Sequence, residues 1–164
     1  MSLIEDLYRQ NEWANLEVLE LCRGLTEEQL GATLEGTYGS IAATLTHMIA
    51  AEAGYVVRLG GTYTGPRVPY DSFPGFDVLE AATRAATAGL IERAHAALAE
   101  SYTVRETEGN ASADVDAELM LGQALIHGAD HRSQVCTILT TLGFEIPEID
   151  AWGWGLATGR FREL

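Results

Sequence analysis

The 164-residue chain contains no lysine: its ten basic residues are all arginine, against 24 acidic residues, for a formal net charge of −14. A charge of this sign and size repels phosphate backbones, and no stripe of arginines along the sequence offsets it. The composition therefore argues against a nucleic-acid partner.

Cysteine is almost absent as well. Cys22 and Cys136 lie far apart and form no CxxC motif. In a cytosolic chain, two isolated cysteines indicate small, buried thiols rather than a disulfide or a redox pair.

Long hydrophobic runs are also missing. The most apolar stretches are interrupted well before the roughly 18 residues that a membrane span requires. The first 20 residues are acidic and amphipathic, unlike the basic start and apolar centre of a signal peptide. We therefore expect a cytoplasmic protein without a membrane partner, and the length predicts a single domain, residues 1–164, with its own hydrophobic core.

Four long segments carry apolar residues at helical spacing, which predicts an all-α fold and a four-helix bundle. The predicted helices cover residues 2–23, 41–59, 77–100 and 114–143, with a short helical turn at 26–30. The expected capping residues are Ser40, Thr26 with Gln29, Asp77 with Glu80, and Asp114 or a neighbour at helix starts, and Gly24 and Gly143 at helix ends.

The connections between these helices are unequal. Residues 60–75 are rich in glycine and proline and carry Tyr63, Tyr70 and Phe73, so this long loop is either a lid or pocket wall, or a connection whose aromatic rings pack on the bundle. Residues 101–107 alternate as a strand would, but no partner strand is apparent, and 108–114 reads as a turn. Trp152 and Trp154 are expected to pack across the bundle end, a site mouth or a second subunit.

The fourth predicted helix carries His127 and His131 in an otherwise apolar segment. Residues four apart lie on one face of a helix, so both imidazoles can reach one metal ion. A third ligand is available in His47, which lies among small side chains on the second predicted helix. Chance spacing of structural histidines is the alternative, but two buried imidazoles require partners.

Three neutral nitrogens would leave a divalent ion at least one open position, as in catalytic sites. Water held there can reach a pKa near 7, or a thiol can bind as thiolate. Gln134 and Asp130 are candidates to orient an imidazole, and Glu52 is the other acid near the proposed site. A solvent-facing or helix-packing role is the alternative for each. Arg132 is expected at the surface or anchoring a loop, and His95 at the surface.

These residues also resemble a known family. The segments Trp13-Ala14-Asn15, TLTHMIAAE and HGADHRSQVCTILTTLGFEIPEID look like the DinB-like superfamily of bacterial proteins. The resemblance covers nearly the whole chain. Its most specific residues are His47 with Glu52, the H-x-x-x-H-R-x-Q run from His127 to Gln134, and then Gly143, Pro147 and Asp150.

The resemblance implies a four-helix bundle in an up-down-down-up arrangement with a long loop between its second and third helices, commonly as a homodimer. It also implies a divalent metal ion, zinc or nickel, held by the histidines that match His47, His127 and His131. Relatives include thiol S-transferases that use mycothiol or bacillithiol, and metal-dependent hydrolases and isomerases. The family name refers to induction by DNA damage and not to DNA binding.

Three hypotheses follow. The first is a metal-dependent enzyme that transfers a low-molecular-weight thiol to an electrophile, with the 60–75 loop and the C-terminal tryptophans shaping the acceptor pocket. The second is a metal-dependent hydrolase. The third is a non-enzymatic, metal-binding stress-response dimer whose ion stabilises the bundle.

Overall fold

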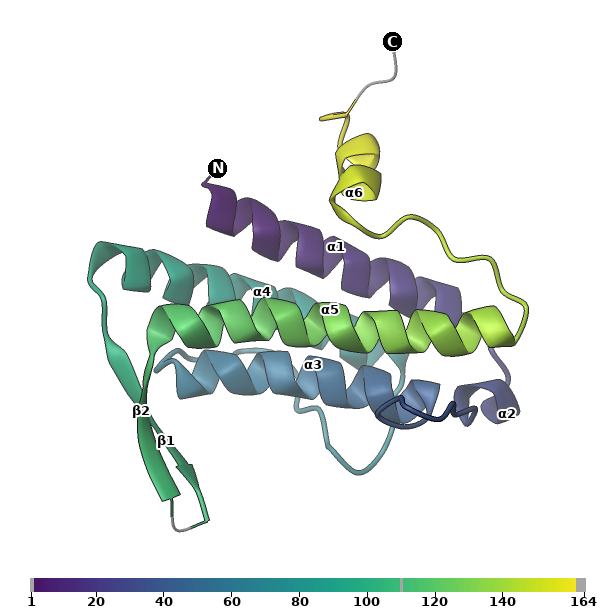
Figure 1. Ribbon diagram of the computed structural model, residues 1–164, viewed down its shortest axis with the longest axis horizontal. Helices are drawn as coiled ribbons and strands as arrows, with labels where there is room; N and C mark the ends of the chain where they lie inside the picture. Colours follow the sequence, from purple (N-terminus) through teal and green to yellow (C-terminus); the bar gives the residue numbers. More distant parts are fainter. Residues whose placement is uncertain (1, 110, 162–164) are drawn as a thin grey trace.

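The computed structural model describes residues 2–109 and 111–161 and is mostly helical. Its elements are α1 (Leu3–Arg23), α2 (Glu27–Leu30), α3 (Ile41–Arg58), α4 (Phe76–Ala99), β1 (Thr103–Glu108), β2 (Ala111–Asp116), α5 (Ala117–Thr141) and α6 (Ala151–Ala157). The long helices α1, α3, α4 and α5 pack alongside one another (Figure 1). Among the described helices, none is both long and apolar enough to cross a bilayer.

Short polar side chains start most of these helices, as the sequence predicts. Ser40 Oγ accepts a hydrogen bond from the backbone N–H of Ala43 at the start of α3. Thr26 and Gln29 form a reciprocal capping box on α2. These bonds satisfy backbone donors that have no partner inside the helix.

The expected capping box on α4 is wrong. The helix begins at Phe76 after Gly75, which caps it without a side-chain hydrogen bond. Asp77 and Glu80 instead form ion pairs with Arg23 at the end of α1. The two acids therefore join α4 to α1 rather than cap their own helix.

The hydrophobic core consists of two clusters, one toward each end of the long helices. One is built around Leu19, Ile49 and Val135, and the other around Tyr8 and Val56. Each cluster draws on α1, α3, α4 and α5, so the four helices are held together at both ends. Between the clusters the helix interfaces carry polar side chains, and these position the site described below.

The segment after α4 differs from the sequence prediction, which gave residues 101–107 no partner strand and made 108–114 a turn. β1 and β2 pair as an antiparallel hairpin in which Val104 faces Val115 and Arg105 faces Asp114. The hairpin extends beyond one end of the helices (Figure 1). The second strand has few large apolar residues, so its sequence alone resembles a turn; Asp116, not Asp114, precedes α5.

The C-terminal segment also differs from its prediction. Residues 151–157 form α6, which Asp150 starts by accepting hydrogen bonds from the N–H groups of Trp152 and Gly153. This helix stands against α1, away from the rest of the structure (Figure 1). Neither the bundle end nor a site mouth covers Trp152, which is 66% exposed in the single chain, so packing against a second subunit stays a prediction.

The two cysteines are free, as expected. Cys22 is fully buried and Cys136 is half-buried. Burial raises the pKa of the Cys22 thiol to about 12 and raises that of Cys136 as well. Both thiols therefore stay protonated at neutral pH and are poor nucleophiles.

Candidate metal centre

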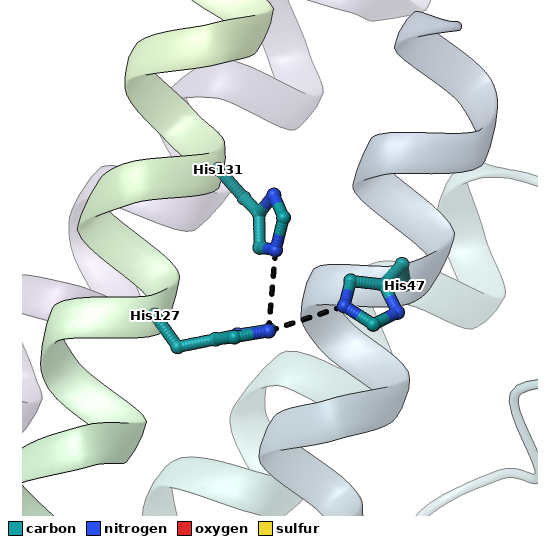
Figure 2. Close-up of side chains that lie close together, drawn as sticks. All are labelled: His47, His127 and His131. Atoms are coloured by element: carbon teal, nitrogen blue, oxygen red, sulfur yellow. Dashed lines mark hydrogen bonds between the residues drawn. The ribbon is translucent and has the colours of Figure 1, made fainter. Parts of the chain in front are cut away.

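Three histidines meet between α3 and α5. His127 and His131 lie one turn apart on α5, and His47 lies on the facing side of α3. Figure 2 shows the three rings pointing toward one another across the space between the two helices. All three side chains can place a ligand atom within 4.8 Å of the other two. They form a group that can hold a metal ion.

The Nε2 atoms are the ones that face each other. His127 Nε2 lies 3.1 Å from His47 Nε2 and 3.2 Å from His131 Nε2. Two nitrogens bound at roughly 2.0–2.1 Å to one tetrahedral ion lie about 3.3–3.4 Å apart. Both separations are close to that edge length, as binding of one ion by these nitrogens requires.

Gln134 determines which nitrogen of His131 carries the proton. Gln134 Oε1 accepts a hydrogen bond from the backbone N–H of Tyr38 at 2.9 Å, which identifies that atom as the amide oxygen. The same Oε1 lies 3.2 Å from His131 Nδ1. An acceptor oxygen requires Nδ1 to be the N–H donor, so in the neutral ring Nε2 has a free lone pair. That lone pair faces the other two histidines.

Burial favours the neutral form of the other two rings. It is the main cause that lowers the pKa of His127 to about 4, with the charges of His131 and His47 adding to it and Asp130 opposing it. Burial also lowers the pKa of His47, and the charge of His131 contributes. Neutral imidazoles are the form that binds a metal ion. The buried Nδ1 atoms of both rings have no hydrogen-bond partner among the described residues.

Aromatic rings surround the group. Tyr38 stacks on His47 with ring centroids 4.1 Å apart and meets His131 edge-on at 5.2 Å. Tyr70, from the connection between α3 and α4, lies 6.2 Å from His47, and Tyr55 on α3 lies 6.1 Å from His127. In the connection at 60–75, Tyr63 and Phe73 pack on the core, as one alternative expected, and Tyr70 lies near His47; a lid or pocket-wall role stays a prediction.

A buried polar network lies behind the histidines. The Nδ2 atoms of Asn11 and Asn15 both donate to Glu52 Oε1 at 2.9 Å, and their Oδ1 atoms accept from Arg132 Nη1 at 2.6 and 2.7 Å. The two amides thus connect a carboxylate on α3 to a guanidinium on α5 through α1. Burial raises the pKa of Glu52, whereas the asparagine hydrogen bonds and the charge of Arg132 oppose that rise.

This network corrects one prediction and adds two residues that the sequence analysis did not select as functional. Arg132 is not at the surface: only 6% of it is exposed. Its long side chain can be buried because two amide oxygens and a nearby carboxylate compensate for lost hydration. Asn11 and Asn15 are spaced four apart on the buried side of α1, and two amides at that spacing were the signal available in the sequence.

The remaining candidates lie elsewhere. His95 is exposed on α4, as predicted. Asp130 is exposed and acts on His127 only through its charge, whereas Gln134 makes the orienting contact expected of it. Trp152 and Trp154 line a cavity between α1 and α6 that includes none of the three histidines. The tryptophans therefore do not form the mouth of the histidine site.

Two comparisons with known proteins bear on this arrangement. The sequence profile of the DinB family matches residues 1–155, a range that includes all three histidines and the polar network. No curated protein matches the chain.

Proposed function

This chain belongs to the DinB family, and we propose that it is a metal-dependent enzyme that transfers a low-molecular-weight thiol to an electrophile. The metal ligands would be His47, His127 and His131, and the ion zinc or nickel. The observation that carries the proposal is the convergence of three Nε2 atoms, with the lone pair of His131 Nε2 directed to the centre by Gln134.

The donor set fits a divalent ion with catalytic capacity. When bound, an ion held by three neutral nitrogens keeps its full positive charge and an open position, so it lowers the pKa of a thiol that approaches it. In the transfer, the S–H bond breaks and the proton passes to solvent. The sulfur uses its electron pair to bond to the electrophilic carbon, and the leaving group departs with the electrons of the broken bond.

Residues around the histidines orient an imidazole and exclude water from the site. Gln134 holds the proton of His131 on Nδ1 and so keeps Nε2 free. Tyr38, which is 54% exposed, covers the outer side of His47 and excludes water from one side of the group.

The finer architecture belongs to the same proposal. We infer a single domain in which α1, α3, α4 and α5 form the four-helix bundle of the family in its up-down-down-up order, with residues 59–75 as the long connection. In support, α4 ends and α5 begins at the hairpin end, where α3 also ends (Figure 1). A cytoplasmic homodimer is the expected assembly.

Elemental analysis of the purified, untagged protein tests the site first. We expect close to one divalent ion per chain in the wild type and in His95→Ala, and a loss of metal affinity of about ten-fold or more in His127→Ala. Metal loss in His95→Ala, or none in His127→Ala, would show that the ligand assignment is wrong.

Activity is tested with the metal-loaded protein. The thiol donors are mycothiol and bacillithiol, and the electrophile is 1-chloro-2,4-dinitrobenzene. Thiol-dependent product formation that disappears in His127→Ala supports the transferase. Ester or amide hydrolysis without thiol would instead support the hydrolase, and a metal that changes only the stability of the protein would support the non-enzymatic role.

A further inference from the structure

A second cavity lies between α3, α5 and the hairpin. It has a volume of about 240 Å³ and is lined by residues of α3, α5, β1 and β2. Small-molecule sites commonly enclose about 300–1,000 Å³, so this one suits a compact group such as a single substituted ring.

The cavity is lined by two residues that are neighbours of His127. Tyr55 lines it and also contacts the ring of His127 at 6.1 Å. Gln123 lines it too, and this residue lies one helical turn before His127 on α5, a rise of about 6 Å. Two residues that line the cavity, Tyr55 and Gln123, are therefore neighbours of His127, although none of the three histidines lines it.

The walls of the cavity are apolar. Val115, Leu119 and Met120 line it together with the ring of Tyr55, and Gln123 supplies an uncharged hydrogen-bonding amide. Leu119 is 66% exposed at the rim, and Ile126, seven residues later on the same side of α5, is exposed as well. A bound apolar group would remove part of this surface from water.

The charged residues that line the cavity, Arg58 and Glu106, form an ion pair with each other. Arg58 donates from Nε to Glu106 Oε1 at 2.9 Å and from Nη2 to Oε2 at 2.5 Å. Its guanidinium also lies 4.9 Å from the ring centroid of Tyr55. Because this arginine is already paired, and the whole chain carries a net charge of −14, an anionic ligand is disfavoured.

We propose that this cavity between α3, α5 and β2 binds the second substrate, an uncharged and largely apolar electrophile with an aromatic or similarly compact body. The assignment rests on the thiol transfer proposed above and names the acceptor's chemical class. The acceptor pocket would then lie beside the hairpin. The C-terminal tryptophans, which were expected to shape this pocket, would not line it.

Binding is tested without any reaction by methionine methyl NMR of the full chain. The sequence has three methionines, Met1, Met48 and Met120. Met120 lines the cavity, whereas Met48 is fully buried in the other core cluster. The probe is 2,4-dinitrotoluene, which is uncharged and has a methyl group in place of a leaving group. We expect the Met120 signal to shift with saturation while the Met48 signal stays unchanged, in both metal-free and metal-loaded protein.

A matched pair of variants locates the probe. Leu119→Arg places a charge at the rim and should weaken binding of the probe about ten-fold or more, with metal content unchanged. Leu98→Arg on α4 is the control, because Leu98 is also 66% exposed but does not line the cavity. An unmoved Met120 signal up to the solubility limit of the probe, or equal affinities in the two variants, would overturn the proposal.

The result of the probe-binding experiment can be distinguished from the result of the thiol-transfer assay. Saturable binding at Met120 without thiol turnover of 1-chloro-2,4-dinitrobenzene would retain the cavity as a ligand site and remove the thiol transfer. Thiol turnover with an unshifted Met120 signal would retain the transferase and show that its acceptor binds elsewhere.

Discussion

At the scale of single residues, Gly128 connects the histidines to the polar network behind them. It lies between His127 and His131 on α5. A Cβ at this position would come within 2.9 Å of both Asn11 Oδ1 and Glu52 Oε1. Gly122, on the same helix, has no atom within 4 Å of the corresponding position. The two glycines share a helix but differ in what a methyl group would displace.

We expect Gly128→Ala to lower the free energy of unfolding by about 1–3 kcal/mol, because the methyl group displaces buried hydrogen-bonded side chains. Gly122→Ala should leave it unchanged or raise it by up to about 1 kcal/mol, since alanine is the better helix former. Urea unfolding of both variants checks this. A Gly128→Ala protein as stable as Gly122→Ala would mean that the network tolerates displacement.

Residue types and spacing were sufficient to select the three histidines that the structure brings together. His127 and His131 were predicted from their separation, and His47 from the small side chains around it. The surroundings of Arg132 could not be predicted in this way, because its burial depends on two amides more than 100 residues away in the chain. When the partners of a buried charge lie far away in the sequence, the residues next to that charge carry no pattern that predicts its burial.

At the scale of elements, the two glycines that follow α1 and α5 show that a glycine at a helix end does not by itself determine the backbone conformation there. Both were predicted as C-terminal glycines from position alone. Gly24 has an ordinary φ of −83°, whereas Gly143 has a φ of +87° in the left-handed region. Neither has an atom within 4 Å of where a Cβ would be. Any difference between alanine variants therefore reports backbone conformation.

Gly143→Ala should cost about 1 kcal/mol of unfolding free energy, since an L-residue is strained at that φ. Gly24→Ala should be neutral or slightly stabilising. Thermal unfolding of the pair is the measurement. Equal midpoints would indicate that the chain after α5 relaxes to another conformation.

The helices were predictable to within a few residues at either end because their apolar spacing and most of their caps are local. The hairpin and α6 were not. β2 is held by its register with β1 and by Val115 packing near α3 and α5, and α6 is held by Asp150 and α1. These contacts come from the tertiary structure, which outweighs the weak local pattern of both segments.

At the scale of the whole molecule, an ion held by His47, His127 and His131 would join α3 to α5. A ligand that binds only the folded state adds about 2.7 kcal/mol at a hundred times its dissociation constant. Removing the metal with a chelator should therefore lower the thermal midpoint by roughly 5–10 °C for a protein of this size. The midpoint of His127→Ala should not respond to the chelator; the same decrease in that variant would contradict a metal link between the helices.

The separation of the three histidines in the chain would also determine when the proposed metal ion can be bound. His47 and His127 are 80 residues apart, and their Nε2 atoms meet only when α3 and α5 have docked. During synthesis the first histidine emerges long before the other two, so a nascent chain has no complete site to offer. Metal loading would then follow folding, and the identity of the ion would depend on which divalent metal the cell supplies to the finished protein.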